Sequence, residues 1–142
     1  MVDVKYRTSA TAIGGGRAGH TKSADGKLDM QLSVPEELGG SGGDGTNPEQ
    51  LFAAGYAACI LGAMQYVAAQ EKINLPDVTT VTVEVAIGKR EDGTGFGLEV
   101  AIKAKVPGMK RAVVEPLVEK ADIVCPYSHA TKGNIKRSLI VT

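Results

Sequence analysis

Two segments in the middle of the chain alternate between apolar and polar residues. Within residues 78–87, apolar side chains occupy every second position from Val81 to Ile87, and the same spacing returns in residues 97–106. A period of two is that of a half-buried β-strand, and Asp92-Gly93 between the segments is typical of a tight hairpin turn. The pattern therefore predicts an antiparallel hairpin.

A looser alternation runs along the first part of the chain. Residues 4–13, 18–23 and 27–34 each favour a strand. Gly14-Gly15-Gly16 interrupts the pattern after the first segment, and Asp25-Gly26 predicts a hairpin between the second and third. Residues 35–46 follow as a glycine-rich connection, so we expect three short strands before the first helix.

The centre of the chain carries the longest apolar segment. Asn47-Pro48-Glu49 favours a helix start, because Asn is a good N-cap, Pro fits the first helical position and an acid complements the helix dipole. The helix is expected to end near Glu71. Residues 51–69 carry no charge and approach the length of a membrane span, but they are rich in Ala and Gly. That content favours a long central helix buried in protein, and we expect no membrane contact.

The remaining residues predict further helices and a last strand. Residues 109–123 are helical in pattern, with a kink or a break into two pieces expected at Pro116. Val124-Cys125-Pro126-Tyr127-Ser128 is expected to open a short helix, and residues 135–141 to form a strand. This order predicts one α+β domain, residues 1–142, with a mostly antiparallel sheet.

Composition and charge exclude several classes of partner. The 142 residues carry 16 basic and 16 acidic side chains and no Trp, so nothing indicates a nucleic-acid surface. The N-terminal residues lack the apolar stretch of a signal peptide, which favours the cytoplasm. A structural disulfide is not expected in that compartment, so the two cysteines of the chain require a chemical explanation.

Two motifs resemble binding sites, one for a dinucleotide and one for zinc, but neither has the sequence context that such a site needs. Gly40-Ser41-Gly42-Gly43-Asp44-Gly45 matches a dinucleotide fingerprint but follows no buried strand, so we expect a turn-rich loop and no bound cofactor. Cys125 and His129 stand four residues apart, and His20 and Cys59 would complete a four-ligand set. Because zinc sites generally have two close-spaced ligand pairs, we expect no metal site.

The two cysteines are more informative together than alone. Cys59 in mid-helix is by itself typical of a small buried apolar residue, and Cys125 lies at a helix start, where backbone N–H groups favour a thiolate. As a pair they form a plausible dithiol/disulfide couple. A reactive Cys59 would need a cation, because an apolar helix disfavours the thiolate. Arg17, in a glycine-rich loop, is the candidate, and Glu49, about three turns before Cys59, could orient it. Without this context both charges would be interpreted as solvated surface groups.

The same residues carry a resemblance to a known family. Residues 47–59, from Asn47-Pro48-Glu49 to Cys59, and Val124-Cys125-Pro126-Tyr127-Ser128 closely resemble the two cysteine motifs of the organic hydroperoxide resistance (Ohr) proteins of the Ohr/OsmC family. Gly15-Gly16-Arg17 resembles the arginine loop of that family. The resemblance covers essentially the whole chain. It implies an OsmC-like α+β fold in an intertwined homodimer, with active sites at the subunit interface.

The resemblance also implies a mechanism. Cys59 would attack an organic hydroperoxide, Cys125 would resolve the product to a disulfide, and Arg17 and Glu49 would form the activating pair. The reductant would be an external dithiol, the dihydrolipoyl groups of a lipoylated protein, rather than a bound cofactor. No role is assigned to His129, where the family more often has a smaller polar residue.

Substrate preference is the finest prediction from the sequence. Leu51, Phe52, Ile60 and Met64 near Cys59 favour an alkyl hydroperoxide over hydrogen peroxide. Two alternatives remain open: an OsmC-type peroxidase of broader peroxide specificity, and a non-enzymatic redox-sensing or binding module.

Overall fold

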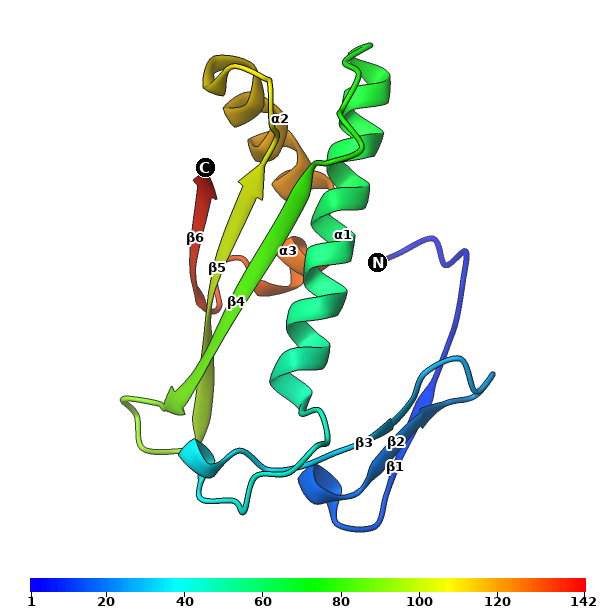
Figure 1. Cartoon of the computed structure of the whole chain (residues 1–142), viewed down its shortest axis with the longest axis vertical. Helices are drawn as coiled ribbons and strands as arrows, with labels where there is room; N and C mark the ends of the chain where they lie inside the picture. The colour runs from blue at the N-terminus through cyan, green and yellow to red at the C-terminus, as the bar shows by residue number, and fades with distance from the viewer. The chain divides into compact units, whose positions relative to one another are not determined.

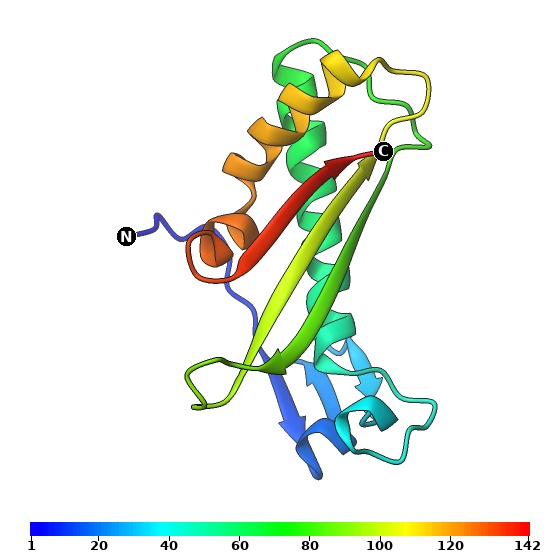
Figure 2. The same cartoon turned by 90° about the vertical axis from the view of Figure 1, so that its left-hand side faces the viewer.

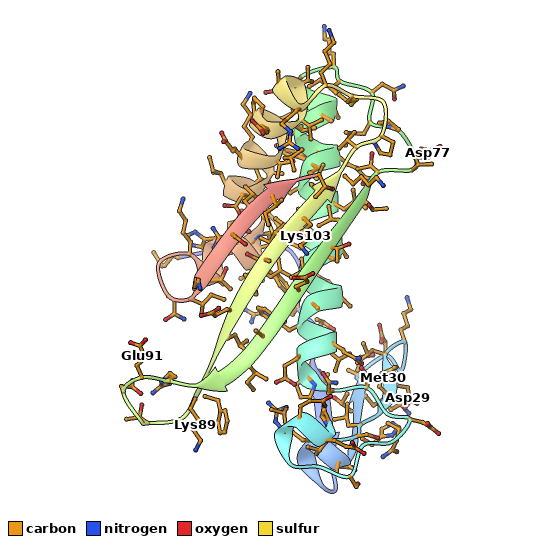
Figure 3. All side chains as sticks on the ribbon, turned by 60° about the vertical axis from the view of Figure 1, so that its left-hand side comes forward. Asp29, Met30, Asp77, Lys89, Glu91 and Lys103 are labelled. Carbon is orange, nitrogen blue, oxygen red and sulfur yellow. The ribbon has the colours of Figure 1, made fainter.

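The hairpin that the alternating pattern predicts forms as β4 (Thr80–Lys89) and β5 (Phe96–Lys105), in a computed structural model that describes residues 1–142. β6 (Lys136–Val141) adds to the other side of β5 in parallel. Along β5, Ile102 and Ala104 are buried, whereas Lys103 between them lies on the opposite face of the sheet (Figure 3). The period of two therefore divides this sheet into an apolar inner face and a polar outer face.

Three helices cover the inner face of the sheet. They are α1 (Pro48–Gln70), α2 (Arg111–Val124) and α3 (Pro126–Thr131). Figure 2 shows α1 and α2 behind β4, β5 and β6, and Figure 1 shows α1 next to β4. The core that they enclose belongs to one of two compact units into which the chain divides, residues 52–142; residues 1–51 form the other.

The central helix begins where the sequence predicts. Asn47 Oδ1 accepts the backbone N–H of Gln50 at 2.8 Å, and Pro48 is the first helical residue. The helix buries one side, which is made of residues at helical spacing: Tyr56, Ile60, Ala63, Met64, Val67 and Ala68. The other side, which includes Ala54, Ala58 and Gly62, is exposed in the single chain.

By length and composition α1 is also the one helix that could cross a membrane. Its buried side forms part of the hydrophobic core of residues 52–142. Core packing gives this helix its apolar character without any bilayer.

Helix α2 excludes one of the two outcomes predicted at Pro116, a break into two pieces. Pro116 neither ends the helix nor splits it, since residues Arg111–Val124 form one element. Proline removes one backbone N–H donor from the helix interior. Val114 on one side of it and Leu117 and Val118 on the other are all buried in the core. Packing on both sides of Pro116 offsets the missing hydrogen bond.

The first unit holds a small antiparallel sheet of three strands, β1 (Ala10–Ile13), β2 (His20–Ser23) and β3 (Asp29–Gln31). The sequence predicts longer first and third strands. Both are shorter because each pairs with β2, which has four residues. The predicted glycine-rich segment forms a connection that includes a short 3₁₀ helix, η2 (Glu36–Leu38).

The observed class is the predicted one, α+β with two sheets. Every strand pair is antiparallel except β5 with β6. A parallel pair requires a long crossover, and α2 and α3 supply it. This crossover places Cys125 in the same unit as Cys59.

Core packing of α2 gives a first prediction. Leu117 is 1% exposed and Ile123 on the same helix is 72% exposed. Leu117→Ala should lower the free energy of unfolding by about 2–5 kcal/mol through lost burial and a residual cavity. Ile123→Ala is the matched control and should stay within about 0.5 kcal/mol of the parent. Urea unfolding measures both, and equal effects would contradict the packing of α2.

Candidate active site

The two cysteines meet inside the second unit. Cys59 lies midway along α1 and Cys125 lies between α2 and α3, 66 residues apart in sequence, and their Sγ atoms are 2.6 Å apart. Both are free thiols; Cys59 is partly exposed and Cys125 is buried. The structure thus brings the two predicted cysteines into direct contact, which is the condition for a disulfide between them.

Local backbone geometry fixes the place of Cys125. Its N–H donates to the Ala121 carbonyl at 2.9 Å, and its own carbonyl accepts the His129 N–H at 3.0 Å. Its backbone is extended, with φ −65° and ψ 122°, and Pro126 begins α3. Cys125 therefore ends one helix and caps the next, as its motif predicts.

The surroundings of Cys59 in this unit disfavour its ionised form. Burial, together with the neighbouring Cys125 thiol, raises the pKa of Cys59 to about 11, although the backbone N–H of Tyr127 acts in the opposite direction. Only a very small fraction of such a thiol is ionised at neutral pH. A reactive Cys59 would need a further positive group.

The predicted arginine and glutamate also meet, in the first unit. Arg17 lies in the 3₁₀ helix η1 (Gly16–Ala18) and Glu49 in the first turn of α1. Arg17 Nη1 donates to Glu49 Oε2 at 2.9 Å and Nη2 donates to Oε1 at 2.7 Å. This two-pronged bond lowers the pKa of Glu49 and raises that of Arg17, so both groups are charged at neutral pH.

Glycine shapes the loop that carries Arg17. Gly16 has φ +60°, in the region that favours glycine, and a Cβ on Gly19 would collide with the backbone oxygen of Ile13. The loop therefore needs small residues on both sides of the arginine. Arg17 and Glu49 belong to the first unit, whereas Cys59 and Cys125 belong to the second.

The apolar residues near the cysteines differ from the predicted set. Ile60 and Met64 are 0% exposed and belong to the core, so the protein's own side chains fill the space around them. The apolar residues that are exposed instead are sequence neighbours of Cys125: Ile123, Val124 and Tyr127. The sequence could not distinguish these sets, because the period of α1 alone does not say which face the core covers.

Three aromatic rings, two on α1 and one on α3, pack against one another. Phe52, Tyr56 and Tyr127 have ring centroids 5.7–6.2 Å apart. The Tyr127 ring can lie against α1 because residue 55 is glycine; a Cβ there would be 3.0 Å from the Tyr127 hydroxyl. The sequence predicts Phe52 as an apolar neighbour of Cys59 but predicts no contact for Tyr127.

A buried polar cluster was missed altogether. It consists of Arg137, Asp122, Tyr56, Ser128 and Thr131, and we call it the Arg137 cluster. Arg137 donates to both oxygens of Asp122, at 2.8 and 3.0 Å, with side chains 14% and 13% exposed. The ion pair lowers the pKa of Asp122. A charged residue in a strand near the end of the chain carried no signal of this contact in the sequence.

The residues considered as metal ligands do not gather. His20 bonds Asp29 in the first unit, whereas Cys59 and Cys125 belong to the second unit. The structure contains no group of three or more His, Cys, Asp or Glu side chains able to hold a metal ion. The two sulfurs have each other as immediate partners.

Comparison with known proteins identifies the family. The family model for OsmC-like proteins matches residues 40–139. An organic hydroperoxide resistance protein of Xanthomonas axonopodis pv. citri (strain 306) is 55% identical over 136 residues, covering 96% of this chain and 94% of that protein. OhrB of Bacillus subtilis (strain 168) is 41% identical over 128 residues, covering 90% and 92%.

Solved structures agree with these relatives. An organic hydroperoxide resistance protein from Elizabethkingia anophelis, with thiocyanate bound, superposes with a TM-score of 0.92 at 48% identity over 99% of each chain. A putative one from Vibrio cholerae, with captopril bound in one of its active sites, gives 0.89 at 44% identity over 98% of this chain and 93% of that one. The fold is thus OsmC-like, and the chain belongs to the Ohr/OsmC family. Membership of this family supports a role in peroxide detoxification.

The buried ion pair gives a prediction on pH. Because Arg137 lowers the pKa of Asp122 below 3.8, the stability that the ionised carboxylate contributes is present above the unfolded value and is lost as pH falls through the lower folded value. Asp122→Asn should therefore destabilise the protein most at neutral pH. The difference in free energy of unfolding between parent and variant should become smaller below about pH 4.

Urea unfolding of parent and variant across this range measures the gap. Asp77→Asn, an exposed aspartate before β4 (Figure 3), is the control and should leave stability near the parent's at every pH. A gap that stayed constant with pH would show that the charge of Asp122 does not stabilise the fold.

Proposed function

We propose that this protein is a thiol peroxidase that reduces organic hydroperoxides to alcohols, with Cys59 as the attacking thiolate and Cys125 as the resolving thiol. The observation that carries the proposal is the contact between the two sulfurs, 2.6 Å apart and both reduced. A pair of thiols held this way can pass reversibly to a disulfide without moving an element of the fold.

The proposed chemistry runs in three steps. The Cys59 thiolate attacks one peroxide oxygen, the O–O bond breaks, and the alkoxide leaves and is protonated to the alcohol. Cys59 is then a sulfenic acid, and the Cys125 sulfur displaces its hydroxyl as water to form the disulfide. An external dithiol reduces the disulfide by exchange and becomes a disulfide itself.

The thiolate needs activation, and we assign it to Arg17 held by Glu49. With a pKa near 11 from burial and Cys125, the Cys59 thiol would be inert at neutral pH. A guanidinium near the sulfur would lower that pKa by charge and by hydrogen bonding. The two-pronged bond to Glu49 keeps the guanidinium in one orientation.

Exposed apolar residues that neighbour Cys125 in sequence are suited to contact an organic substrate. Ile123 is 72% exposed, Val124 46% and Tyr127 40%, all within two residues of Cys125. An alkyl group that covers this surface is favoured by about 0.8 kcal/mol for each methylene buried, which hydrogen peroxide cannot supply. The Vibrio cholerae neighbour holds captopril in one of its active sites, so an organic molecule enters that protein's site.

We further propose an external dithiol as the reductant, with dihydrolipoyl groups on a lipoylated protein as the physiological source and no bound cofactor. Cys59 is the more accessible sulfur, since Cys125 is buried. A dithiol attacking the disulfide at Cys59 would release Cys125 as the leaving thiolate. We infer the cytosol as the place of action, because its thiol pools would keep the external dithiol reduced.

A homodimer completes the proposal. The uncovered side of α1 carries Ala54, Ala58 and Gly62, and Tyr66 on the same helix is 55% exposed. An apolar helix face of this length is unusual on the surface of a monomer. A second copy of the chain, intertwined with the first as in the family resemblance, would cover it.

One assay distinguishes the proposed function from its two alternatives, a broader peroxidase and a redox-sensing module. A broader OsmC-type peroxidase would use hydrogen peroxide as well as it uses alkyl hydroperoxides. A redox-sensing module would form the disulfide once and would not turn over with a dithiol. Peroxide consumption with dihydrolipoamide, comparing tert-butyl hydroperoxide with hydrogen peroxide, separates all three.

Cysteine variants test the assigned roles. Cys59→Ser should abolish hydroperoxide consumption, because no other thiol starts the reaction. Cys125→Ser should consume hydroperoxide in the first turnover, lose turnover with dihydrolipoamide, and accumulate sulfinic acid at Cys59. Consumption kinetics and mass spectrometry of the Cys59 peptide give both results. Equal and mild losses in the two variants would mean that the cysteines are structural.

The activating pair has its own test. In Arg17→Ala the pKa of Cys59, measured by the pH dependence of its alkylation, should rise toward about 11. Arg17→Lys should restore only part of the shift, because an ammonium cannot bond carboxylate and sulfur with a planar fork. Arg7→Ala, an exposed arginine of the same unit, is the control. A Cys59 titration unchanged by Arg17→Ala would remove Arg17 from the mechanism.

A further inference from the structure

The angle between α2 and α3 decides where the Cys125 sulfur points. Cys125 is the single residue between the two helices, in extended backbone, and its hydrogen bonds end α2 and begin α3. Figure 1 shows the two helices joined at this point beside α1. Backbone bonds on either side of one residue do not hold two helices at a fixed angle, so side chains across the junction must do so.

The Arg137 cluster bridges this junction. Asp122 lies three residues before Cys125, on α2, and Ser128 lies three residues after it, on α3. Arg137 of β6 donates to both Asp122 oxygens at 2.8 and 3.0 Å and lies 3.4 Å from Ser128 Oγ through Nη1. One guanidinium therefore ties the helix before the resolving cysteine to the helix after it.

The same cluster reaches the helix that carries Cys59. Tyr56 lies about one turn before Cys59 on α1, and its hydroxyl meets Arg137 Nη1 at 3.1 Å, Ser128 Oγ at 2.9 Å and Thr131 Oγ1 at 3.0 Å. Tyr56 and Ser128 are fully buried. The Arg137 cluster thus links α1, which carries Cys59, to the two helices that flank Cys125, although neither cysteine belongs to the cluster.

We propose that Arg137, held by Asp122, is a positioning residue that keeps the Cys125 sulfur against Cys59 and so sets the stability of their disulfide and the speed of its formation. This inference rests on the proposed function. In the step concerned, the Cys125 sulfur attacks the Cys59 sulfenic sulfur, the S–S bond forms, the S–O bond breaks, and the hydroxyl leaves as water with the thiol proton.

The physical argument is one of effective concentration. A thiol fixed beside its partner reacts as an intramolecular group, and freedom in its position lowers that advantage. A second hydroperoxide competes with Cys125 for the sulfenic acid, and its product is a sulfinic acid. A looser α2–α3 junction should therefore weaken the disulfide and increase over-oxidation together.

The first experiment measures the disulfide without peroxide. Parent and Arg137→Lys, each checked for folding by circular dichroism, are equilibrated in buffers of reduced and oxidised lipoamide, and the disulfide fraction is determined by thiol trapping. Lysine keeps the charge and loses the two-pronged bond. We expect the equilibrium constant for the disulfide to fall about tenfold, a rise in reduction potential of about 30 mV. Arg111→Lys, in an exposed pair with Glu115 on α2, is the control and should match the parent.

Tyr56→Phe is the second variant, and it decides the question if Arg137→Lys does not fold. It removes one buried hydroxyl, keeps the ring, and cuts the link between the cluster and α1. We expect a smaller shift in the same direction, and a larger sulfinic acid fraction at Cys59 after a limited dose of tert-butyl hydroperoxide. An equilibrium constant equal to the parent's in a folded variant would overturn the proposal.

The two proposals fail separately. If the parent protein consumed no hydroperoxide, the proposed function would fall, whereas the lipoamide equilibrium would still report on the Arg137 cluster. If the parent turned over hydroperoxide but the equilibrium and the sulfinic acid fraction were unchanged in the variants, only the positioning role would be lost.

Discussion

The contact between the Cys59 and Cys125 sulfurs depends on how α1 packs against the junction of α2 and α3. The two residues are 66 positions apart, and 2.6 Å separates their Sγ atoms. The sheet of β4, β5 and β6 makes this possible, because its parallel β5–β6 pair requires a helical crossover that returns the chain beside α1. The chemistry proposed for the site is therefore a consequence of one crossover connection.

Burial both assembles the pair and opposes its reactivity. The packing that brings the sulfurs together also raises the pKa of Cys59 to about 11. An ionised Arg17 fixed by Glu49 is the kind of group that could offset this effect, and the two form a two-pronged ion pair in the first unit. A peroxidase built on this fold must combine a dry site, which holds the thiols, with a charge, which ionises one of them.

Polar contacts inside the second unit complement the apolar core. Arg137 and Asp122 form an ion pair that is largely buried, and every buried side-chain polar atom of the chain has a hydrogen-bond partner. A satisfied buried network restrains its members more narrowly than apolar packing does, because hydrogen bonds have preferred directions. Such restraint is useful beside a thiol that must meet its partner at bonding distance.

The sequence by itself determined the elements whose signals are local. The alternation in β4 and β5, the Asn47 cap of α1 and the Pro126 start of α3 each depend on neighbouring residues, so these elements were predicted correctly. The motifs also carried the family resemblance, which comparison with relatives confirmed. The sequence left a kink or a break open at Pro116, and the structure has one helix there, because core packing overrides a local preference.

Only the tertiary structure decided which distant residues meet. The Arg137–Asp122 pair joins a strand to a helix, and no period or motif in the sequence links the two positions. The tertiary structure also decided which apolar residues near the cysteines are buried. Ile60 faces the core, whereas Val124 is exposed. Contacts of this kind arise from the packing of whole elements, and a one-dimensional pattern records the face of an element but not what that face meets.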